Sequence, residues 1–493
     1  MVESFRGNGS LALLTDLYQL TMAYGYWKTQ RHDRDAVFHL FFRSSPFQGG
    51  YAIMAGLAPL VETLDDFRFT PDDLAYLASL RGNDHQPLFS KPFLRYLSEL
   101  RLSCDIDAVP EGTVVFPHET LLRVQGPILQ CQILETLLLN SINFPTLIAT
   151  RAARVCQAAQ DDTVLEFGLR RAQGINGAMT ATRAAYIGGC HATSNVLAGK
   201  HYDIPVKGTH AHSWVMSFDG EHEAFAAYAS VMPNNCIFLV DTYDTVHGVA
   251  NAILVAMELR KQGHEMIGVR LDSGDMVTLS HQARAMLDAA GLPDAKIVAS
   301  NDLDEHQIQK LKLDGAQIDI WGVGTRLVTG YEQPALGGVY KLSAICDAEG
   351  QWHDRVKLSE QSVKTSNPGI QQVRRFYRAK QAIADVIYDV RDGTAASPHM
   401  VPMGCDQIRS FLADESEADW QSEDLLVPVL RDGSRVGQWP TIHQIRARTQ
   451  QQLAMISGDV RKLVEPAVYP TGLDVQLFET KRRLIATASP FHG

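Results

Sequence analysis

The sequence lacks a long uncharged apolar run, a strong positive charge and paired cysteine motifs, and each absence excludes a class of protein. No stretch of membrane-spanning length is free of charged residues, so we expect neither a membrane span nor a secretory leader. The net charge is -11, which argues against a broad nucleic-acid surface. The seven cysteines occur without CxxC or CxxH spacing, which favours free thiols in the cytoplasm over disulfides or a structural zinc site.

The two usual nucleotide-binding signatures, GxGxxG and GxxxxGK[ST], are absent as well, and the chain has no internal repeat. The chain does have the composition of a folded protein, since 45% of its residues are hydrophobic and 20% are charged. Its length of 493 residues exceeds that of one ordinary core. We therefore expect two or three structural units.

The order of apolar and polar segments predicts three regions. Residues 1–140 mix helical and strand-like patterns and predict an N-terminal α+β domain, with a first helix capped at Thr15 or Asp16. Residues 141–345 carry short apolar strands separated by helical stretches, which predicts an α/β catalytic domain. Residues 346–493 are more polar and irregular, apart from the helical pattern TIHQIRARTQQQLAMI, and predict a C-terminal accessory region.

Four strands in the middle region end just before polar or glycine residues. They are CIFLV before Asp241, MIGVRL before Asp272, KIVAS before Asn301 and IDIWGV before Gly324. Strands that are apolar on both faces predict a parallel sheet covered by helices, with the chemistry at the carboxyl edge of the strands. We therefore expect an α/β barrel, and a doubly wound sheet is the alternative.

The segment GTHAHSWV places His210 and His212 two residues apart. On a strand, both imidazoles would face the same side. The spacing alone leaves three interpretations open, namely ordinary polar residues, a metal site, or a histidine that attacks a phosphoryl group. The chain has no Cys or HExxH partner motif that would support the metal site.

Carboxylates follow two of the predicted strands. Asp241 and Asp272 could hold Mg²⁺ or accept hydrogen bonds from sugar hydroxyls. Helix capping is the alternative, and we prefer it for Asp244 and Asp275. Arg270 would share a strand face with Asp272, so the pair either clamps an anionic ligand or forms an internal salt bridge.

Glycine and aromatic residues complete the predicted edge. Gly324 and Thr325 follow a strand, where backbone N–H groups can converge on a phosphate, although a simple tight turn is the alternative. In LEFGLRRAQG, Phe167 could stack on a flat ring, while Arg170 either binds an anion or is a solvated surface charge. Tyr18 in the first helix is compatible with simple core packing.

Taken together and in order, several segments resemble the nicotinate phosphoribosyltransferase family from Leu14 to about Gly369. The matching segments are LTDLYQLTMAYGY, EGTVVFP, EFGLRRAQG, TSNVLAG, GTHAHSWV, LVDTYDT, GVRLDSGD, GVGTRLVTG and LGGVYKL. The resemblance implies an irregular α/β barrel of the type II phosphoribosyltransferase kind and a homodimer with shared active sites. It also implies formation of nicotinate mononucleotide and pyrophosphate from nicotinate and phosphoribosyl pyrophosphate, coupled to ATP hydrolysis and dependent on Mg²⁺, in NAD biosynthesis.

The resemblance also implies roles for individual residues. His212 matches the histidine that the family phosphorylates with ATP. Thr209 and Arg270 match positions that contact nicotinate. Phe167 would stack on one face of the pyridine ring, and Tyr18 would reach the other face from the neighbouring subunit.

The remaining implied roles concern the sugar and the phosphates. Gly324 and Thr325 match the stretch that receives the 5-phosphate, and Arg170 and Ser300 are further expected substrate-binding residues. The resemblance implies that Asp241 and Asp272 face the ribose and its magnesium, without a protein cluster dedicated to the metal.

Two other functions remain as alternatives. In the nicotinamide phosphoribosyltransferase family an acidic residue follows the threonine of the segment that reads HATSN here, whereas this chain has Ser194 in that place. A neutral residue favours a carboxylate ligand, because no fixed negative charge repels it. The second alternative is a noncatalytic metabolite-binding protein built on the same barrel, which fold alone does not exclude.

Overall fold

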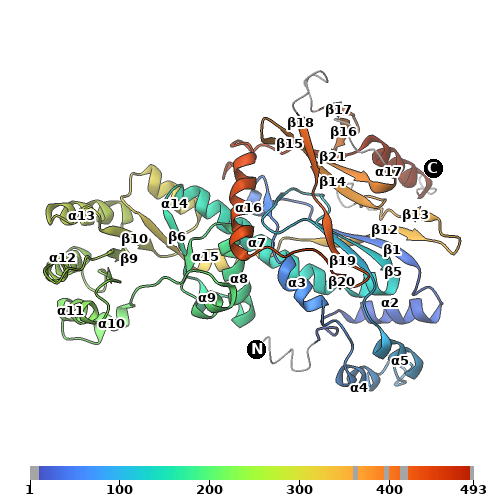
Figure 1. Cartoon of the computed structure of the whole chain (residues 1–493), viewed down its shortest axis with the longest axis horizontal. Coiled ribbons are helices and arrows are strands. Elements are labelled where there is room, and N and C mark those ends of the chain that lie inside the picture. Colours follow the sequence, from blue (N-terminus) through green and yellow to red (C-terminus); the bar gives the residue numbers. More distant parts are fainter. Residues whose placement is uncertain (1–9, 359–364, 393–398, 411–419, 489–493) are drawn as a thin grey trace. The chain divides into compact units, whose positions relative to one another are not determined.

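The computed structural model describes residues 10–358, 365–392, 399–410 and 420–488. Contacts group the chain into two compact units, which Figure 1 shows as ribbons coloured along the sequence. The first unit joins the described residues up to Leu147 with those from Ala335 onward, and the second is Ile148–Pro334. In the described part of the chain, no helix is long and apolar enough to cross a membrane.

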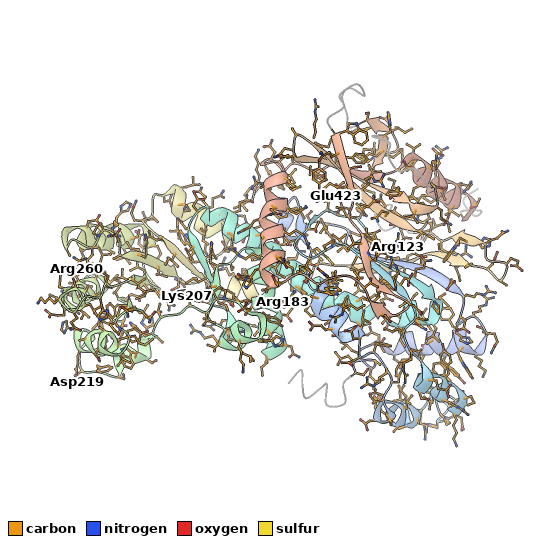
Figure 2. All side chains as sticks on the ribbon, in the orientation of Figure 1. Arg123, Arg183, Lys207, Asp219, Arg260 and Glu423 are labelled. Carbon is orange, nitrogen blue, oxygen red and sulfur yellow. The ribbon has the colours of Figure 1, made fainter. Side chains whose placement is uncertain are left out.

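A seven-stranded antiparallel sheet of described residues forms the centre of the first unit. Its order is β13-β12-β1-β5-β3-β19-β20, so strands from both ends of the chain pair with one another. The strands are β1 Asp35–Phe41, β3 Asp105–Ala108, β5 Leu122–Pro127, β12 Val339–Cys346, β13 Trp352–Asp354, β19 Val427–Arg431 and β20 Ser434–Arg435. Arg123 of β5, labelled in Figure 2, donates to Asp107 of β3 at 2.8 Å and ties two of these strands together.

The first unit also contains helices and a short strand pair. They are α2 Leu17–Lys28, α3 Leu57–Leu64, α4 Pro71–Ser79, α5 Lys91–Glu99 and α6 Ile128–Ile133, with β2 Ala52–Ile53 paired to β4 Val114–Val115. Asp16 is the N-cap of α2 and forms a capping box with Gln19, which confirms the predicted helix start. Helix α7, Glu135–Ala159, continues along the chain from the first unit into the second.

A second sheet of the first unit is built from the C-terminal part of the chain. Its order among the described residues is β17-β16-β21-β15-β14-β18, and only the β15–β21 pair is parallel there. The strands are β14 Gln371–Arg378, β15 Gln381–Asp389, β16 His399–Pro402, β17 Arg409–Ser410, β18 Trp420–Asp424 and β21 Thr471–Leu473. The last helices are α16 Ile442–Met455, which confirms the helical pattern predicted there, and α17 Val475–Ala488.

The second unit is built on a six-stranded sheet whose pairs are all parallel. Its order is β7-β6-β11-β10-β9-β8. The strands are β6 Thr163–Glu166, β7 Ala192–Thr193, β8 Ile237–Leu239, β9 Gly268–Leu271, β10 Lys296–Ser300 and β11 Ile320–Val323. The four predicted strands and the α/β class are confirmed, while among the described residues the hydrogen-bonded series stays open between β7 and β8.

Helices follow the strands of this sheet in the βα order that the spacing predicts. They are α8 Gly174–Gly188, α9 Val196–Tyr202, α10 His212–Met216, α11 Glu221–Val231, α12 Thr245–Lys261, α13 Met276–Ala289, α14 Glu305–Leu313 and α15 Thr325–Val328. Asp244 caps α12 and Asp275 caps α13, so the capping interpretation of both residues is confirmed. At Gly248 of α12, a Cβ atom would lie 2.0 Å from the Val240 carbonyl oxygen, so only glycine lets this helix approach the chain beyond β8 so closely.

Candidate active site

The polar residues that follow the parallel strands meet at the carboxyl edge of the sheet, around the Arg270 side chain. Arg270 Nε donates to Ser300 Oγ at 2.7 Å, and one terminal nitrogen donates to Thr209 Oγ1 at 3.0 Å. The other terminal nitrogen donates to Asp272 Oδ1 at 2.9 Å, which is the salt bridge that the sequence allowed. The guanidinium carbon also lies 5.5 Å from the centre of the Phe167 ring. One cation thus joins residues from four segments at this edge.

The two strand-end carboxylates, Asp241 and Asp272, are connected by a hydrogen bond through the backbone. Asp241 Oδ2 accepts from the Asp272 backbone N–H at 2.9 Å and from Ser273 Oγ at 2.6 Å. Asp272 also accepts a short hydrogen bond from Ser300 Oγ. The other oxygen of Asp241 is buried and has no hydrogen-bond partner among the described residues. The pair therefore presents a fixed negative edge with a free acceptor.

His212 is the first residue of α10 and lies beside these carboxylates. Its Nδ1 lies 3.1 Å from Thr242 Oγ1, and its Nε2 lies 3.9 Å from Asp272 Oδ2. The side chain is 40% exposed. A nucleophilic histidine needs an orienting partner on one ring nitrogen and access to the other, and this arrangement meets both needs.

His210 has a different environment from His212. Its ring is packed among the rings of Phe225, Tyr228 and Phe238, and Nε2 accepts from the Leu239 backbone N–H at 3.2 Å. Burial lowers the pKa of His210, which keeps the imidazole neutral.

The shared face expected for the two histidines on a strand is not formed. The chain leaves the extended conformation after Ala211, the N-cap of α10, and His212 already has helical geometry. The two imidazoles therefore have different partners, Leu239 for His210 and Thr242 for His212. His210 is an ordinary buried histidine, one of the three interpretations that the sequence left open.

Gly322, within β11, makes room for the Phe167 ring. A Cβ atom at Gly322 would lie 2.7 Å from Phe167 Cδ2, so the ring fills space that a side chain there would occupy. The Phe167 backbone N–H donates to the Val323 carbonyl at 2.8 Å. Gly324 and Thr325 follow immediately, and Thr325 opens α15. Phe167 and the Gly324 turn therefore lie side by side.

The two other expected site residues, Arg170 and Tyr18, are exposed. Arg170 is exposed on the short 3₁₀ turn Leu169–Arg171 and makes no ion pair with a described residue. Tyr18 belongs to α2 of the first unit, and its 49% exposure excludes simple core packing. Partial burial and then the nearby Glu135 carboxylate raise the pKa of Tyr18.

Sequence reasoning missed three residues that shape the edge. Thr242 orients His212, and Ser273 holds Asp241. Each directly follows a strand-end aspartate, and that position is a signal that could have identified them. Glu166 precedes Phe167 and is only 1% exposed, and no local pattern marks it as buried.

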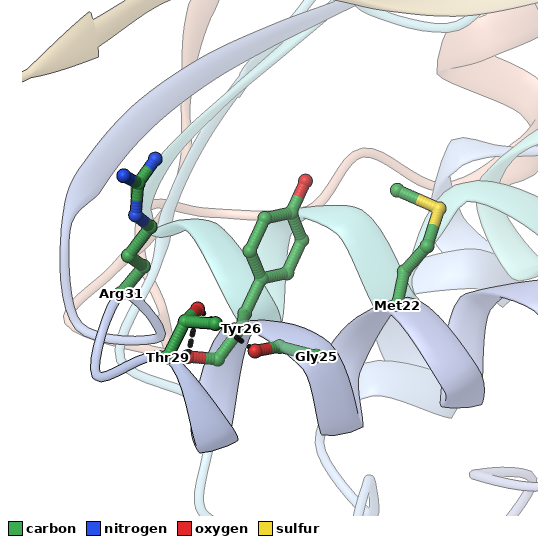
Figure 3. Close-up of a pocket in the computed structure, with 5 residues that line it drawn as sticks. All are labelled: Met22, Gly25, Tyr26, Thr29 and Arg31. Carbon is green, nitrogen blue, oxygen red and sulfur yellow. Dashed lines mark hydrogen bonds between the residues drawn. The ribbon is translucent and has the colours of Figure 1, made fainter.

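One cavity of the first unit, of about 550 Å³, lies along α2 and is lined by Met22, Gly25, Tyr26, Thr29 and Arg31 (Figure 3). There Thr29 Oγ1 donates to the Gly25 carbonyl at 2.8 Å, so its proton is used within the helix end. This cavity contains no residue of the predicted site.

Three family models match successive segments of the chain. The model for the nicotinate phosphoribosyltransferase N-terminal domain matches residues 13–143. The model for the nicotinate phosphoribosyltransferase family matches residues 163–381, and the model for its C-terminal domain matches residues 370–481. The middle match contains the whole strand-end cluster around Arg270.

Individual relatives match over nearly the full length. The nicotinate phosphoribosyltransferase of Bacillus subtilis is 41% identical over 490 residues, covering 98% of this chain and 97% of its own. The human nicotinate phosphoribosyltransferase is 35% identical over 537 residues, covering 97% of both chains. A crystal structure of the human nicotinic acid phosphoribosyltransferase superposes with a TM-score of 0.82 at 32% identity, covering 95% of this chain and 99% of that one.

Proposed function

Because the chain belongs to the nicotinate phosphoribosyltransferase family, we propose that it transfers the phosphoribosyl group of phosphoribosyl pyrophosphate to nicotinate. The products are nicotinate mononucleotide and pyrophosphate, and the reaction serves NAD biosynthesis. The observation that carries this function is the cluster in which Arg270 lies over Phe167 and binds Thr209. It offers a cation, a hydroxyl and an aromatic face together.

Nicotinate is a planar anion, and the cluster suits both properties. An aromatic face stacks on the pyridine ring, and a guanidinium binds the carboxylate. A guanidinium has five N–H donors, and Arg270 uses three of them on Ser300, Thr209 and Asp272. Two donors remain for a ligand. Thr209 adds a hydroxyl beside them.

The strand-end carboxylates suit the sugar. Loss of pyrophosphate from the anomeric carbon develops positive charge on the ribose, and fixed carboxylates stabilise such charge. Asp241 and Asp272 are held in place by hydrogen bonds before any substrate binds, so they need little reorganisation. Gly324 and Thr325 would receive the 5-phosphate, with Arg170 as an exposed anion contact.

Asp241 and Asp272 also suit Mg²⁺, provided that the substrate supplies further ligands to the ion. The described residues contain no group of three or more His, Cys, Asp or Glu side chains arranged around a metal. Mg²⁺ commonly takes one or two carboxylates and completes its shell with phosphate oxygens and water. The free buried oxygen of Asp241 is a suitable ligand, with Asp272 beside it. Bound there, the ion would neutralise charge on the pyrophosphate leaving group.

His212 is the proposed site of ATP coupling. The imidazole attacks the terminal phosphorus of ATP and forms an N–P bond. The bond between that phosphorus and the bridging oxygen breaks, and ADP leaves with the oxygen. Thr242 holds the ring in orientation through Nδ1. Water later hydrolyses the phosphohistidine to histidine and phosphate. That hydrolysis can displace an otherwise reversible transfer toward nicotinate mononucleotide, provided the two phosphorylation states bind the substrates differently.

The proposed assembly is a homodimer in which Tyr18 serves the active site of the neighbouring subunit. Tyr18 and Met22 are 49% and 42% exposed, and their i,i+4 spacing places them on one side of α2. An apolar helix face of this kind is suited to a protein contact.

All seven cysteines lie in the described residues and are free, which supports a reducing compartment such as the cytoplasm.

The test is product formation from phosphoribosyl pyrophosphate and Mg²⁺ with nicotinate or nicotinamide as the base. The proposal expects nicotinate mononucleotide and little nicotinamide product. A preference for nicotinamide would move the chain to the sister activity, which Ser194 argues against. Absence of product from both bases would leave the noncatalytic binding function.

A further inference from the structure

Glu166 is a buried carboxylate at the carboxyl edge of the parallel sheet that the proposed reaction does not use directly. It is the last residue of β6 and is 1% exposed. Its Oε1 accepts a short hydrogen bond from the Gly168 backbone N–H. Its Oε2 accepts from Thr182 Oγ1 at 2.9 Å and from Thr193 Oγ1 at 2.6 Å. One carboxylate thus joins the loop after β6, helix α8 and the end of β7.

The direction of these hydrogen bonds is determined by Asn195. Its backbone N–H donates to Thr193 Oγ1 at 2.9 Å, and its side-chain amide donates to Thr182 Oγ1 at 3.2 Å. Each threonine hydroxyl accepts from Asn195 and therefore turns its single proton toward Glu166. The Gly168 N–H can only donate. Three donors therefore converge on the Glu166 carboxyl group, one on Oε1 and two on Oε2.

Through this network Glu166 fixes the backbone that directly follows Phe167. The Phe167 N–H is held by the Val323 carbonyl, and the next N–H, that of Gly168, is held by Glu166. The ring between these anchors lies against Gly322 and under the Arg270 guanidinium. The backbone carbonyl of Glu166 also accepts from the Ser194 N–H at 3.0 Å. Glu166 therefore sets the backbone of both Phe167 and Ser194.

We infer that Glu166 is a positioning residue for the pyridine base, which acts by holding Phe167 at the distance and tilt needed for stacking. This role rests on the proposed function, since it assumes that Phe167 stacks on nicotinate. It goes beyond that function because the proposed reaction assigns no role to Glu166. A residue that acts only through stacking contributes equally to the ground state and the transition state, so its loss changes KM rather than kcat.

The first test compares Glu166→Gln with the wild type, using Glu223→Gln, an exposed carboxylate of α11, as the matched control. In Glu166→Gln one acceptor becomes a donor that faces either the Gly168 N–H or the two hydroxyl protons, so the Gly168 turn and the Phe167 ring should shift. We expect KM for nicotinate to rise about tenfold, with kcat and KM for phosphoribosyl pyrophosphate changed less than about threefold. The control should match the wild type.

A double-mutant cycle separates positioning from general destabilisation. If Glu166 acts through Phe167, then Glu166→Gln should add no further increase in KM for nicotinate when Phe167 is already alanine. Thr193→Val should share the defect, and Thr193→Ser, which keeps the hydroxyl, should restore wild-type kinetics. Independent, multiplicative effects of the two variants would overturn the role, and so would unchanged kinetics in Glu166→Gln. A wild-type protein that forms no nicotinate mononucleotide would overturn the proposed function, and this role with it.

Discussion

Replacing Arg270 with alanine removes the guanidinium that holds the candidate site together. A hydrogen bond to a charged group contributes about 1.5 to 3 kcal/mol. A tenfold change in an equilibrium constant corresponds to about 1.4 kcal/mol, so loss of the contact to nicotinate should raise KM for nicotinate roughly 10- to 150-fold. The Arg270 and Asp272 side chains are 15% and 34% exposed, so the variant also loses a partly buried salt bridge, and its melting temperature is measured beside KM.

The assay is the initial rate as a function of nicotinate, at saturating phosphoribosyl pyrophosphate and ATP. Arg270→Lys should fall between alanine and wild type, because an ammonium keeps the charge but cannot bind Thr209 and Asp272 with the same fork. Arg260→Ala is the matched control, since Arg260 is an exposed residue of the same unit that pairs with Glu265 at 2.8 Å. An unchanged KM for nicotinate in Arg270→Ala, with the melting temperature preserved, would refute the reasoning.

Three other variants test separate parts of the account. His212→Ala should abolish the acid-labile phosphoprotein and ADP formation, while slow phosphoribosyl transfer persists. His210→Gln should retain phosphorylation, because the His210 ring is buried. Phosphorylation that is lost only in His210→Gln would reverse the assignment. Ser194→Asp should reduce the preference for nicotinate over nicotinamide, measured as the ratio of their kcat/KM values, by about tenfold or more, because a fixed negative charge repels a carboxylate. An unchanged ratio would contradict the role given to Ser194. Arg375→Met should lower the free energy of unfolding by about 3 to 5 kcal/mol in denaturant titrations, because the fully buried Asp385 loses its ion-pair partner. An unchanged free energy of unfolding would show that the ion pair is dispensable.

Local patterns in the sequence predicted the catalytic unit well. Strands such as β9 and β10 are largely buried and lead directly into polar residues, so both their existence and their functional edge follow from burial. Asp244 and Asp275 were recognised as helix caps because capping depends only on the next three residues. The pairing of Arg270 with Asp272 follows from strand alternation.

Features that depend on distant residues were not accessible in this way. Strand β19 pairs with β3 although more than 300 residues separate them, and no local pattern encodes that register. As a result the contacts place the beginning and the end of the chain in one unit. The division into residues 1–140, 141–345 and 346–493 remains a prediction about domains.

The same limit applies inside the site. Strand alternation misplaced the imidazole of His210 because the helix start at His212 interrupts the extended chain. Glu166 looked like an ordinary strand-end residue, because its three donors come from segments up to 27 positions away. Such networks depend on how strands and helices are brought together rather than on any one segment.

The most direct test of the central claim is the end point of nicotinate mononucleotide formation with and without ATP, with ADP followed in the same samples. The account predicts that ATP raises the amount of product at the end point in the wild type, in step with ADP. It also predicts that His212→Ala reaches only the ATP-free level. An end point that ATP leaves unchanged in the wild type, or raises equally in His212→Ala, would contradict coupling through His212.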